Sequence, residues 1–406
     1  MLLVLSCFAQ LHAQSFRAGA AWRNITPDPL LPVSGGVGRP SPVTEKKGDL
    51  YVRALVLESE GTRVAFVSLD NLGWPAVLGN RARALVKSIP PENILIGATH
   101  THSAPDAYGF PDEQGRSFED GKYLEACTVR IAEAIREAEK NLEEAELRLG
   151  YGKVAAGIAY NYYAPELYDP LCGVMQLRSK TSGKPISTLV NFAIHPEVIG
   201  SKRGILSPDI CGPLYETIEQ RGGGVAIFFN GALGGMVTAD NRRKQGEENT
   251  WEECVRIGTA LGNEAFRILE SGKTVSNPRL SVKAQKLEFP VESPLMRFIL
   301  EKSPMGYQVS GGNRVSTVQN LVEIGPARIL TIPGEALPNI GLFLKRKMET
   351  AYPFLFGLTN DAFGYILTRV DYNSFERYNY ITRTSLGEET GEILIRESLK
   401  LISSAK

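Results

Sequence analysis

The sequence predicts an α/β fold in which mixed sheet layers are flanked by helices. Apolar, strand-like runs alternate with segments of helical periodicity along the chain, a pattern typical of α/β and α+β bodies. No internal repeat or low-complexity linker divides the 406 residues, so we expect one large domain.

The chain begins with a stretch typical of a secretory signal peptide, residues 1–13. It has a short apolar core, and Ala13 offers a small residue before a cleavage position at Gln14. A basic start is missing, which indicates a truncated leader. We therefore expect a mature domain of residues 14–406 that is secreted or periplasmic. No later run approaches the roughly 18–20 apolar residues of a membrane helix.

The first half of the mature chain alternates strands with helices. A proline-rich loop at 27–42 is expected at the surface. Two β-rich runs are joined by Ser59-Glu60-Gly61, a hairpin signal. Apolar residues spaced three and four apart, from Tyr123 to Ala138, predict a long helix. The predicted strands are 18–26, 50–58, 62–69, 93–98, 147–150, 174–178 and 187–193, and the helices are 75–88 and 118–146.

The second half continues the alternation. Residues 225–230 are continuously apolar, as in a strand buried on both faces. A helix precedes this strand and another follows it, the latter ending at Ser271-Gly272. The predicted helices are 208–221, 248–270, 336–351 and 386–403, and the further strands are 280–289, 318–324 and 327–332.

Charge and cysteine content exclude some classes of function. Lys plus Arg equals Asp plus Glu, at 45 each, so no global charge favours a nucleic acid or an anionic membrane as partner. Four scattered cysteines remain after the leader, without a C-x-x-C motif. One or two disulfides are compatible with export, and four buried free thiols are at least as compatible. These cysteines are Cys127, Cys172, Cys211 and Cys254.

All three histidines of the mature chain stand at the ends of apolar strands. His100 and His102 follow the run 94–98, and His195 ends the run 189–194. Side chains two apart on a strand point to the same side, and strand ends are where α/β sheets build sites. An isolated pair of this kind is more often one core histidine and one exposed. The third histidine favours a site for zinc or a similar divalent ion.

A carboxylate ligand must come from elsewhere in the chain. Glu335 follows another apolar strand and opens a helix, although a first-turn Glu also stabilises a helix dipole. The glycine-rich loop 230–241 either approaches a ligand closely or is a flexible connection. The sequence has no G-x-S-x-G elbow, no complete phosphate loop or dinucleotide fingerprint, and no H-E-x-x-H motif.

Four short motifs occur in an order that matches one enzyme family. Residues 98–105 (ATHTHSAP) resemble the ATHTHSGP stretch of that family, and 192–196 (FAIHP) resemble its second histidine segment. Residues 333–335 (PGE) resemble its metal-binding glutamate turn, and 358–365 (LTNDAFGY) resemble the segment with its tyrosine ligand. The family is that of the neutral/alkaline (non-lysosomal) ceramidases. The resemblance runs from about residue 18 to the end and implies a ceramidase-like catalytic domain without the family's immunoglobulin-like C-terminal domain.

The resemblance implies a Zn²⁺ ion held by His100, His195, Glu335 and Tyr365, with His102 beside the substrate carbonyl. Without it, Tyr365 would be interpreted as a buried aromatic residue with a satisfied hydroxyl. The resulting hypothesis is a secreted zinc-dependent hydrolase. It would cleave the amide bond of a small-molecule N-acyl substrate, ceramide or a related lipid, by attack of a zinc-bound water. A lipid substrate would bring peripheral contact with a membrane.

Further roles follow for residues around the ion. His102 would hydrogen-bond the developing oxyanion or pass a proton to the leaving amine. Thr238 and the amides of its loop would position the substrate. Asp240, or Asp209, would orient a ligand histidine.

Two departures from the family keep alternatives open. The family loop reads approximately GDVSPN, whereas residues 235–240 place Met236 at the aspartate and Thr238 at the serine. Residues 160–163 lack the family's arginine near the substrate amide. The alternatives are a zinc hydrolase of the same family acting on a non-ceramide amide or ester, and a non-catalytic exported binding protein with a structural zinc. The sequence does not define acyl-chain length, head group or oligomeric state.

Overall fold

The computed structural model describes residues 15–404. The predicted signal peptide, residues 1–13, lies outside the described residues. Within them, no helix has the length and apolar character needed to cross a membrane. Within the described residues, Cys127, Cys172, Cys211 and Cys254 are all buried free thiols, so the second of the two cysteine interpretations is confirmed.

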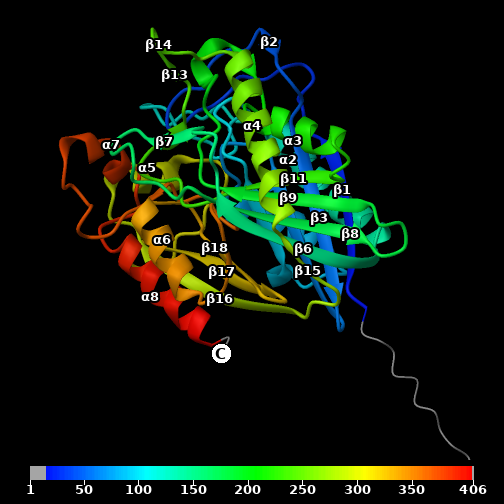
Figure 1. Cartoon of the computed structure of the whole chain (residues 1–406). Helices are drawn as coiled ribbons and strands as arrows, with labels where there is room; N and C mark the ends of the chain where they lie inside the picture. Colours follow the sequence, from blue (N-terminus) through cyan, green and yellow to red (C-terminus); the bar gives the residue numbers. More distant parts are fainter. Residues whose placement is uncertain (1–14, 405–406) are drawn as a thin grey trace, which may run out of the picture.

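A mixed sheet, nine-stranded in the described part of the chain, forms the centre of the molecule (Figure 1). Its two halves are joined by only two residue pairs, between β1 and β6. In Figure 1 the blue strands of one half run steeply and the green strands of the other run across them. The strand order is β11-β9-β8-β6-β1-β3-β4-β5, with β15 beside β6. The bounds are β1 Arg17–Asn24, β3 Tyr51–Ser59, β4 Thr62–Leu69, β5 Ile94–Ala98, β6 Glu143–Lys153, β8 Leu171–Ser179, β9 Pro185–Phe192, β11 Val225–Asn230 and β15 Lys273–Val275.

Each half of this sheet ends in a parallel pair and is covered by its own helices. The parallel pairs are β4–β5 and β9–β11. Helix α2 packs on β1 and β3 with α1 beside it, while α3 packs on β11 and α4 on β6 and β8. The bounds are α1 Ala76–Ala84, α2 Gly121–Lys140, α3 Cys211–Gln220 and α4 Trp251–Glu270.

A second, four-stranded sheet of order β16-β17-β18-β20 packs against the large one. The two sheets share a core. In it the Phe356 ring stacks on Phe229, with ring centroids 4.0 Å apart, and meets Phe66 edge-on, with centroids 5.6 Å apart. Helices α6 and α8 cover the second sheet, and α5 packs against α7. The bounds are β16 Leu280–Pro290, β17 Arg314–Ile324, β18 Ala327–Thr331, β20 Tyr352–Phe356, α5 Pro294–Lys302, α6 Pro338–Lys347, α7 Asn379–Arg383 and α8 Thr390–Ser403.

Short pairs of strands hold the connecting loops. The two that matter for the site are β7 with β12 and β19 with β21. The bounds of the short elements are β2 Glu45–Lys46, β7 Ala159–Asn161, β10 Ile205–Leu206, β12 Val237–Ala239, β13 Arg242–Arg243, β14 Gly246–Glu247, β19 Glu335–Ala336, β21 Tyr365–Ile366, and the 3₁₀ turns Pro91–Asn93, Ser201–Arg203 and Glu376–Tyr378.

The predicted class, mixed sheet layers with flanking helices, is confirmed. Several predicted elements differ in extent, and others, such as strand β20, were not predicted at all. The helix predicted over 118–146 ends at Lys140, and β6 begins at Glu143, where burial alternates with period two. Helix α5 was not predicted. Its start signal is a Ser293 side chain that accepts from the Met296 N–H, followed by Pro294 at the first turn.

Candidate metal centre

Two histidines reach the site from the two halves of the large sheet. His100 lies two residues beyond β5, and its N–H donates to the Asn71 carbonyl. Its φ of +72° is in the left-handed region, which residues other than glycine rarely adopt. His195 lies three residues beyond β9, and its N–H donates to the Val237 carbonyl at 2.9 Å.

Backbone carbonyls fix the orientation of both rings. The Nδ1 of His100 contacts the Leu72 carbonyl, and the Nδ1 of His195 contacts the Val237 carbonyl at 2.7 Å. A carbonyl oxygen only accepts, so Nδ1 carries the proton in each ring. In the neutral ring Nε2 then presents a lone pair, the form in which histidine binds a metal.

The Glu335 carboxylate lies between the two Nε2 atoms. Its Oε2 is 3.2 Å from Nε2 of His195 and 3.5 Å from Nε2 of His100. Strand β19 pairs in parallel with β21, which sets Glu335 opposite Tyr365. The Tyr365 hydroxyl donates to the sulfur of Met236 at 3.3 Å.

The charges at this point require a cation. Burial alone would raise the pKa of Glu335, but the adjacent His100 and His195 hold it well below its usual value. Burial would lower the pKa of His195, but Glu197 and Glu335 raise it. Two ring lone pairs facing a carboxylate repel it unless a proton or a metal ion lies among them. Two imidazole nitrogens and a carboxylate oxygen, without cysteine, fit zinc or a similar divalent ion.

His102 sits beside this group with a different partner. One ligand atom from each of His100, His102 and His195 can lie within 4.8 Å of the others. The Nδ1 of His102, however, is 3.5 Å from Oε2 of Glu197. Its Nε2 is buried with no hydrogen-bond partner among the described residues. Burial, only partly offset by Glu197, lowers the pKa of His102 to about 3, so the ring is neutral.

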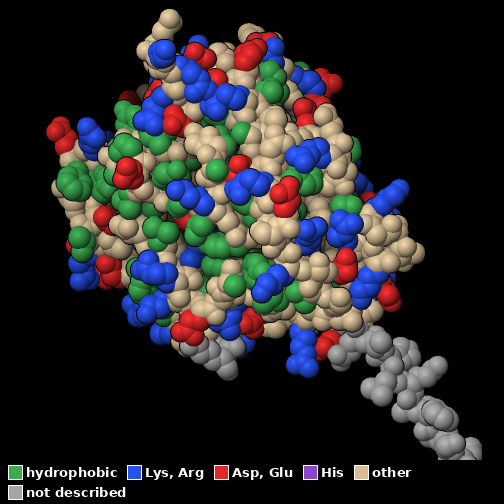
Figure 2. All heavy atoms as spheres, in the orientation of Figure 1, with side chains coloured by type: hydrophobic (Ala, Val, Ile, Leu, Met, Phe, Trp, Pro, Cys, Tyr) green, Lys and Arg blue, Asp and Glu red, His purple; other side chains and the backbone are tan. Residues whose placement is uncertain are grey.

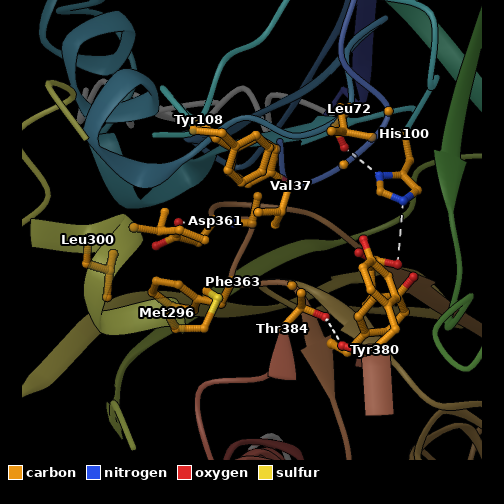
Figure 3. Close-up of a pocket in the computed structure, with 18 of the residues that line it drawn as sticks. Val37, Leu72, His100, Tyr108, Met296, Leu300, Asp361, Phe363, Tyr380 and Thr384 are labelled. Atoms are coloured by element: carbon orange, nitrogen blue, oxygen red, sulfur yellow. Dashed lines mark hydrogen bonds and ion pairs between the residues drawn. The ribbon is translucent and has the colours of Figure 1, made fainter. Parts of the chain in front are cut away.

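The site opens into a largely apolar pocket (Figure 3). The pocket encloses about 670 Å³ of free space, its mouth included. In Figure 3, His100 and Tyr380 lie on one side, and the apolar side chains of Met296, Leu300 and Phe363 lie on the other. The lining combines residues from distant segments, namely Gly35, Gly36, Val37, Leu72, His100, His102, Tyr108, Phe110, Met296, Ile299, Leu300, Tyr307, Glu335, Asp361, Ala362, Phe363, Gly364, Tyr365, Tyr380 and Thr384.

The other residues expected at the site have different surroundings. Thr238 forms a parallel bridge with His195 and lines a separate polar pocket. Both carboxylate oxygens of Asp240 accept from Arg242 at 2.9 Å. Asp209 accepts from the N–H groups of Ile199 and Ile210. The Nδ1 atoms of His100 and His195 therefore contact backbone carbonyls, and neither Asp209 nor Asp240 orients these rings.

The loop amides expected to meet substrate are used inside the protein. The Gly234 N–H donates to the Ala336 carbonyl at 2.9 Å, and the Val237 N–H donates to Leu233. A Cβ on Gly234 would lie 2.2 Å from the Glu335 carbonyl oxygen. This glycine therefore permits a close approach to the strand that carries Glu335, not to a ligand.

Sequence reasoning missed two contributors to the site. Glu197 stands two residues after His195, and that proximity in the histidine motif was the signal that could have found it. The loop of Gly35, Gly36 and Val37 lines the pocket, and a Cβ on Gly36 would lie 3.1 Å from the Tyr380 hydroxyl. Its glycines suggested only a surface turn.

Comparisons with known proteins bear on the fold. No protein-family profile matches the chain, and no curated protein matches its sequence. Among solved structures, the neutral ceramidase from Pseudomonas aeruginosa superposes with a TM-score of 0.80 at 17% identity, over 97% of this chain and 74% of that one. A ceramidase complexed with C2 superposes with a TM-score of 0.78 at 16% identity, over 97% of this chain and 75% of that one. The chain therefore has the neutral ceramidase fold over nearly its whole length.

Proposed function

We propose that this chain is an exported zinc-dependent hydrolase that cleaves the amide bond of an N-acyl lipid, ceramide or a close relative. The observation that carries the proposal is the convergence of His100, His195 and Glu335, of which His100 and Glu335 line an apolar pocket. The likeness of the fold to two ceramidases adds to it. A structural zinc in a binding protein would not need to line a pocket of this kind.

His100, His195 and Glu335 would hold the ion, and Tyr365, opposite Glu335 on the paired strand, would complete the set. A bound zinc ion supplies positive charge that polarises an acyl carbonyl and lowers the pKa of water. The Leu72 and Val237 carbonyls keep both rings aimed at this point. The surrounding apolar side chains exclude bulk water, which strengthens each electrostatic contact inside.

The apolar wall supports an acyl chain as one part of the substrate. Met296, Leu300 and Phe363 lie away from the histidines, so a chain packed against them would leave its carbonyl end near His100. Each buried methylene contributes about 0.8 kcal/mol to binding. The substrate we propose is therefore an amphiphile whose apolar tail enters the pocket.

The zinc set is tested by removing its members one at a time. His100→Ala and His195→Ala should each lower the bound zinc from one equivalent toward zero, measured by elemental analysis, and abolish ceramide hydrolysis. Circular dichroism should stay that of the parent. His102→Ala is the matched control, because its ring contacts Glu197 and should leave the zinc in place. Unchanged zinc in the first two variants would disprove the site.

A second substrate class is favoured by one contact. Met236 stands where the resembled family has an aspartate, and its sulfur accepts a hydrogen bond from the Tyr365 hydroxyl. The polar groups offered to the substrate beside Tyr365 therefore differ, which favours a non-ceramide amide or an ester. Rates on ceramide, a short N-acyl amide and the matching ester, measured with one preparation, decide between the two. A kcat/KM for the short substrates above that for ceramide selects the alternative.

A further inference from the structure

Glu197 is held against His102 by the backbone as well as by its charge. The His102 N–H donates to the Pro196 carbonyl at 3.1 Å, which ties the two histidine segments together. The carboxylate of the next residue then lies 3.5 Å from the Nδ1 of His102. The Glu197 side chain is 22% exposed, so the contact lies at the edge of the buried site.

Glu197 offers a carboxylate to the His102 ring. Its other side faces a polar pocket also lined by Glu247 and Asn249. An ionised carboxylate accepts hydrogen bonds and donates none.

The position of Glu197 determines which ring nitrogen of His102 carries the proton. A carboxylate 3.5 Å from Nδ1 favours a proton on that nitrogen, and a neutral imidazole carries only one proton. Nε2 then carries a lone pair. This atom is buried, has no partner among the described residues, and belongs to a ring that lines the apolar pocket. It can accept a proton from a group in the pocket, but it cannot donate one first.

We propose that Glu197 is a positioning residue that holds His102 in the Nδ1–H tautomer, so that Nε2 serves as the proton acceptor of the hydrolysis. This inference rests on the proposed function. Nε2 takes a proton from the attacking water as the water oxygen bonds to the acyl carbon. The imidazolium, paired with Glu197, then returns the proton to the amide nitrogen as the C–N bond breaks. The products are a carboxylic acid and an amine.

The proposal separates two roles that the sequence leaves open for His102. A donor to the oxyanion at the start of the reaction needs a proton on Nε2, whereas a proton acceptor needs the lone pair there. The Glu197 contact selects the second role. A carboxylate that orients a histidine in this way sets its tautomer and stabilises the imidazolium.

The tautomer can be read directly, because the chain has only four histidines. The holoenzyme is labelled with ring-¹⁵N histidine, and His102→Gln identifies the His102 signals. We expect a protonated Nδ1 and an unprotonated Nε2 for His102 in the parent protein. In Glu197→Ala the His102 signals should shift toward the Nε2–H form, while those of His100 and His195 stay. An Nε2–H tautomer in the parent protein would overturn the proposal.

Kinetics supply an independent readout. Glu197→Ala should lower kcat on the order of 10²-fold, the usual contribution of a positioned proton-transfer group, with KM and zinc content unchanged. Glu197→Asp should recover part of the loss. Glu247→Gln, in the same polar pocket, is the matched control and should behave as the parent. A Glu197→Ala enzyme with the kcat of the parent, or one that loses its zinc, contradicts a positioning role. If no amide is hydrolysed, the proposed function fails while the tautomer measurement still stands.

Discussion

His100 occupies a backbone conformation that its side chain does not favour. Its φ of +72° lies in the left-handed region, which costs a residue with a Cβ roughly 1–2 kcal/mol relative to its preferred conformations. Strain of this kind persists where the surrounding structure holds it and often marks a functional position. Here the Asn71 carbonyl and the Leu72 carbonyl hold the residue on both sides.

Substitutions at His100 should reveal that strain. With zinc removed by a chelator, His100→Gly should be more stable than His100→Ala by about 1 kcal/mol, because glycine adopts a positive φ without penalty. Urea denaturation of the two variants gives the difference. At His195, where φ is not positive, the order should reverse or vanish. Equal stability of the His100 pair would show that the residue is not strained in solution.

The sequence predicted single site residues unevenly, for physical reasons. A local sequence pattern, a polar residue after an apolar strand, identified His100, His195 and Glu335. The structure brings these side chains together. Asp240 also lies in a loop that follows an apolar strand, but both of its carboxylate oxygens accept hydrogen bonds from Arg242. Glu197 gave no pattern of its own, because its importance comes from a contact with His102, 95 positions away in the chain.

The short strand β19 shows how an element positions a ligand. It presses its backbone against Gly234, and only a residue without a Cβ fits there, because that atom would lie 2.2 Å from the Glu335 carbonyl oxygen. The Gly234 N–H also donates to Ala336 in the same strand. The sequence showed the glycine-rich loop but not that β19 packs against it. A run of glycines indicates a close approach to the backbone without identifying the segment that approaches.

Gly234→Ala should therefore displace Glu335. We expect a loss of roughly 1–3 kcal/mol in stability, as for overpacked interiors, and at least about 10-fold weaker zinc binding, as when a group that orients a ligand is lost. Competition with a chromophoric chelator measures the affinity, and urea denaturation measures the stability. Gly311→Ala, where a Cβ meets nothing within 4 Å, should change neither. A fully active Gly234→Ala protein would mean that β19 can move without cost.

At the scale of the whole molecule, the candidate site forms where three separate units meet. One half of the large sheet supplies His100, the other supplies His195, and the segment after β18 supplies Glu335. Alternating strands and helices sufficed to predict the fold class. The division into two halves was not predictable, because it depends on β1 and β6 pairing through only two residue pairs across more than a hundred residues.

The segment 370–380, which contributes Tyr380 to the pocket lining, carries exposed aromatic and apolar side chains. Val370 is 82% exposed, Phe375 64% and Tyr380 46%, and Tyr380 also lines the pocket. The rings of Phe375 and Tyr378 meet edge-on, with centroids 5.3 Å apart. In Figure 2, hydrophobic side chains gather on the side of the molecule where Figure 1 places α7. Tyrosine and phenylalanine on such a surface favour the interface of a lipid layer.

If the substrate is drawn from a lipid layer, this surface should control access to it without taking part in the chemistry. Val370→Ser combined with Phe375→Ser should lower binding to phosphatidylcholine vesicles on the order of 10-fold, because both side chains would lose an apolar environment. Hydrolysis of ceramide in those vesicles should fall in parallel, while hydrolysis of a soluble short-chain substrate should not. Trp22→Ser is the control, since Trp22 is 47% exposed on β1, outside the pocket lining. Equal losses on the vesicle-bound and the soluble substrate would place the defect in the pocket and rule out this surface as the contact with lipid.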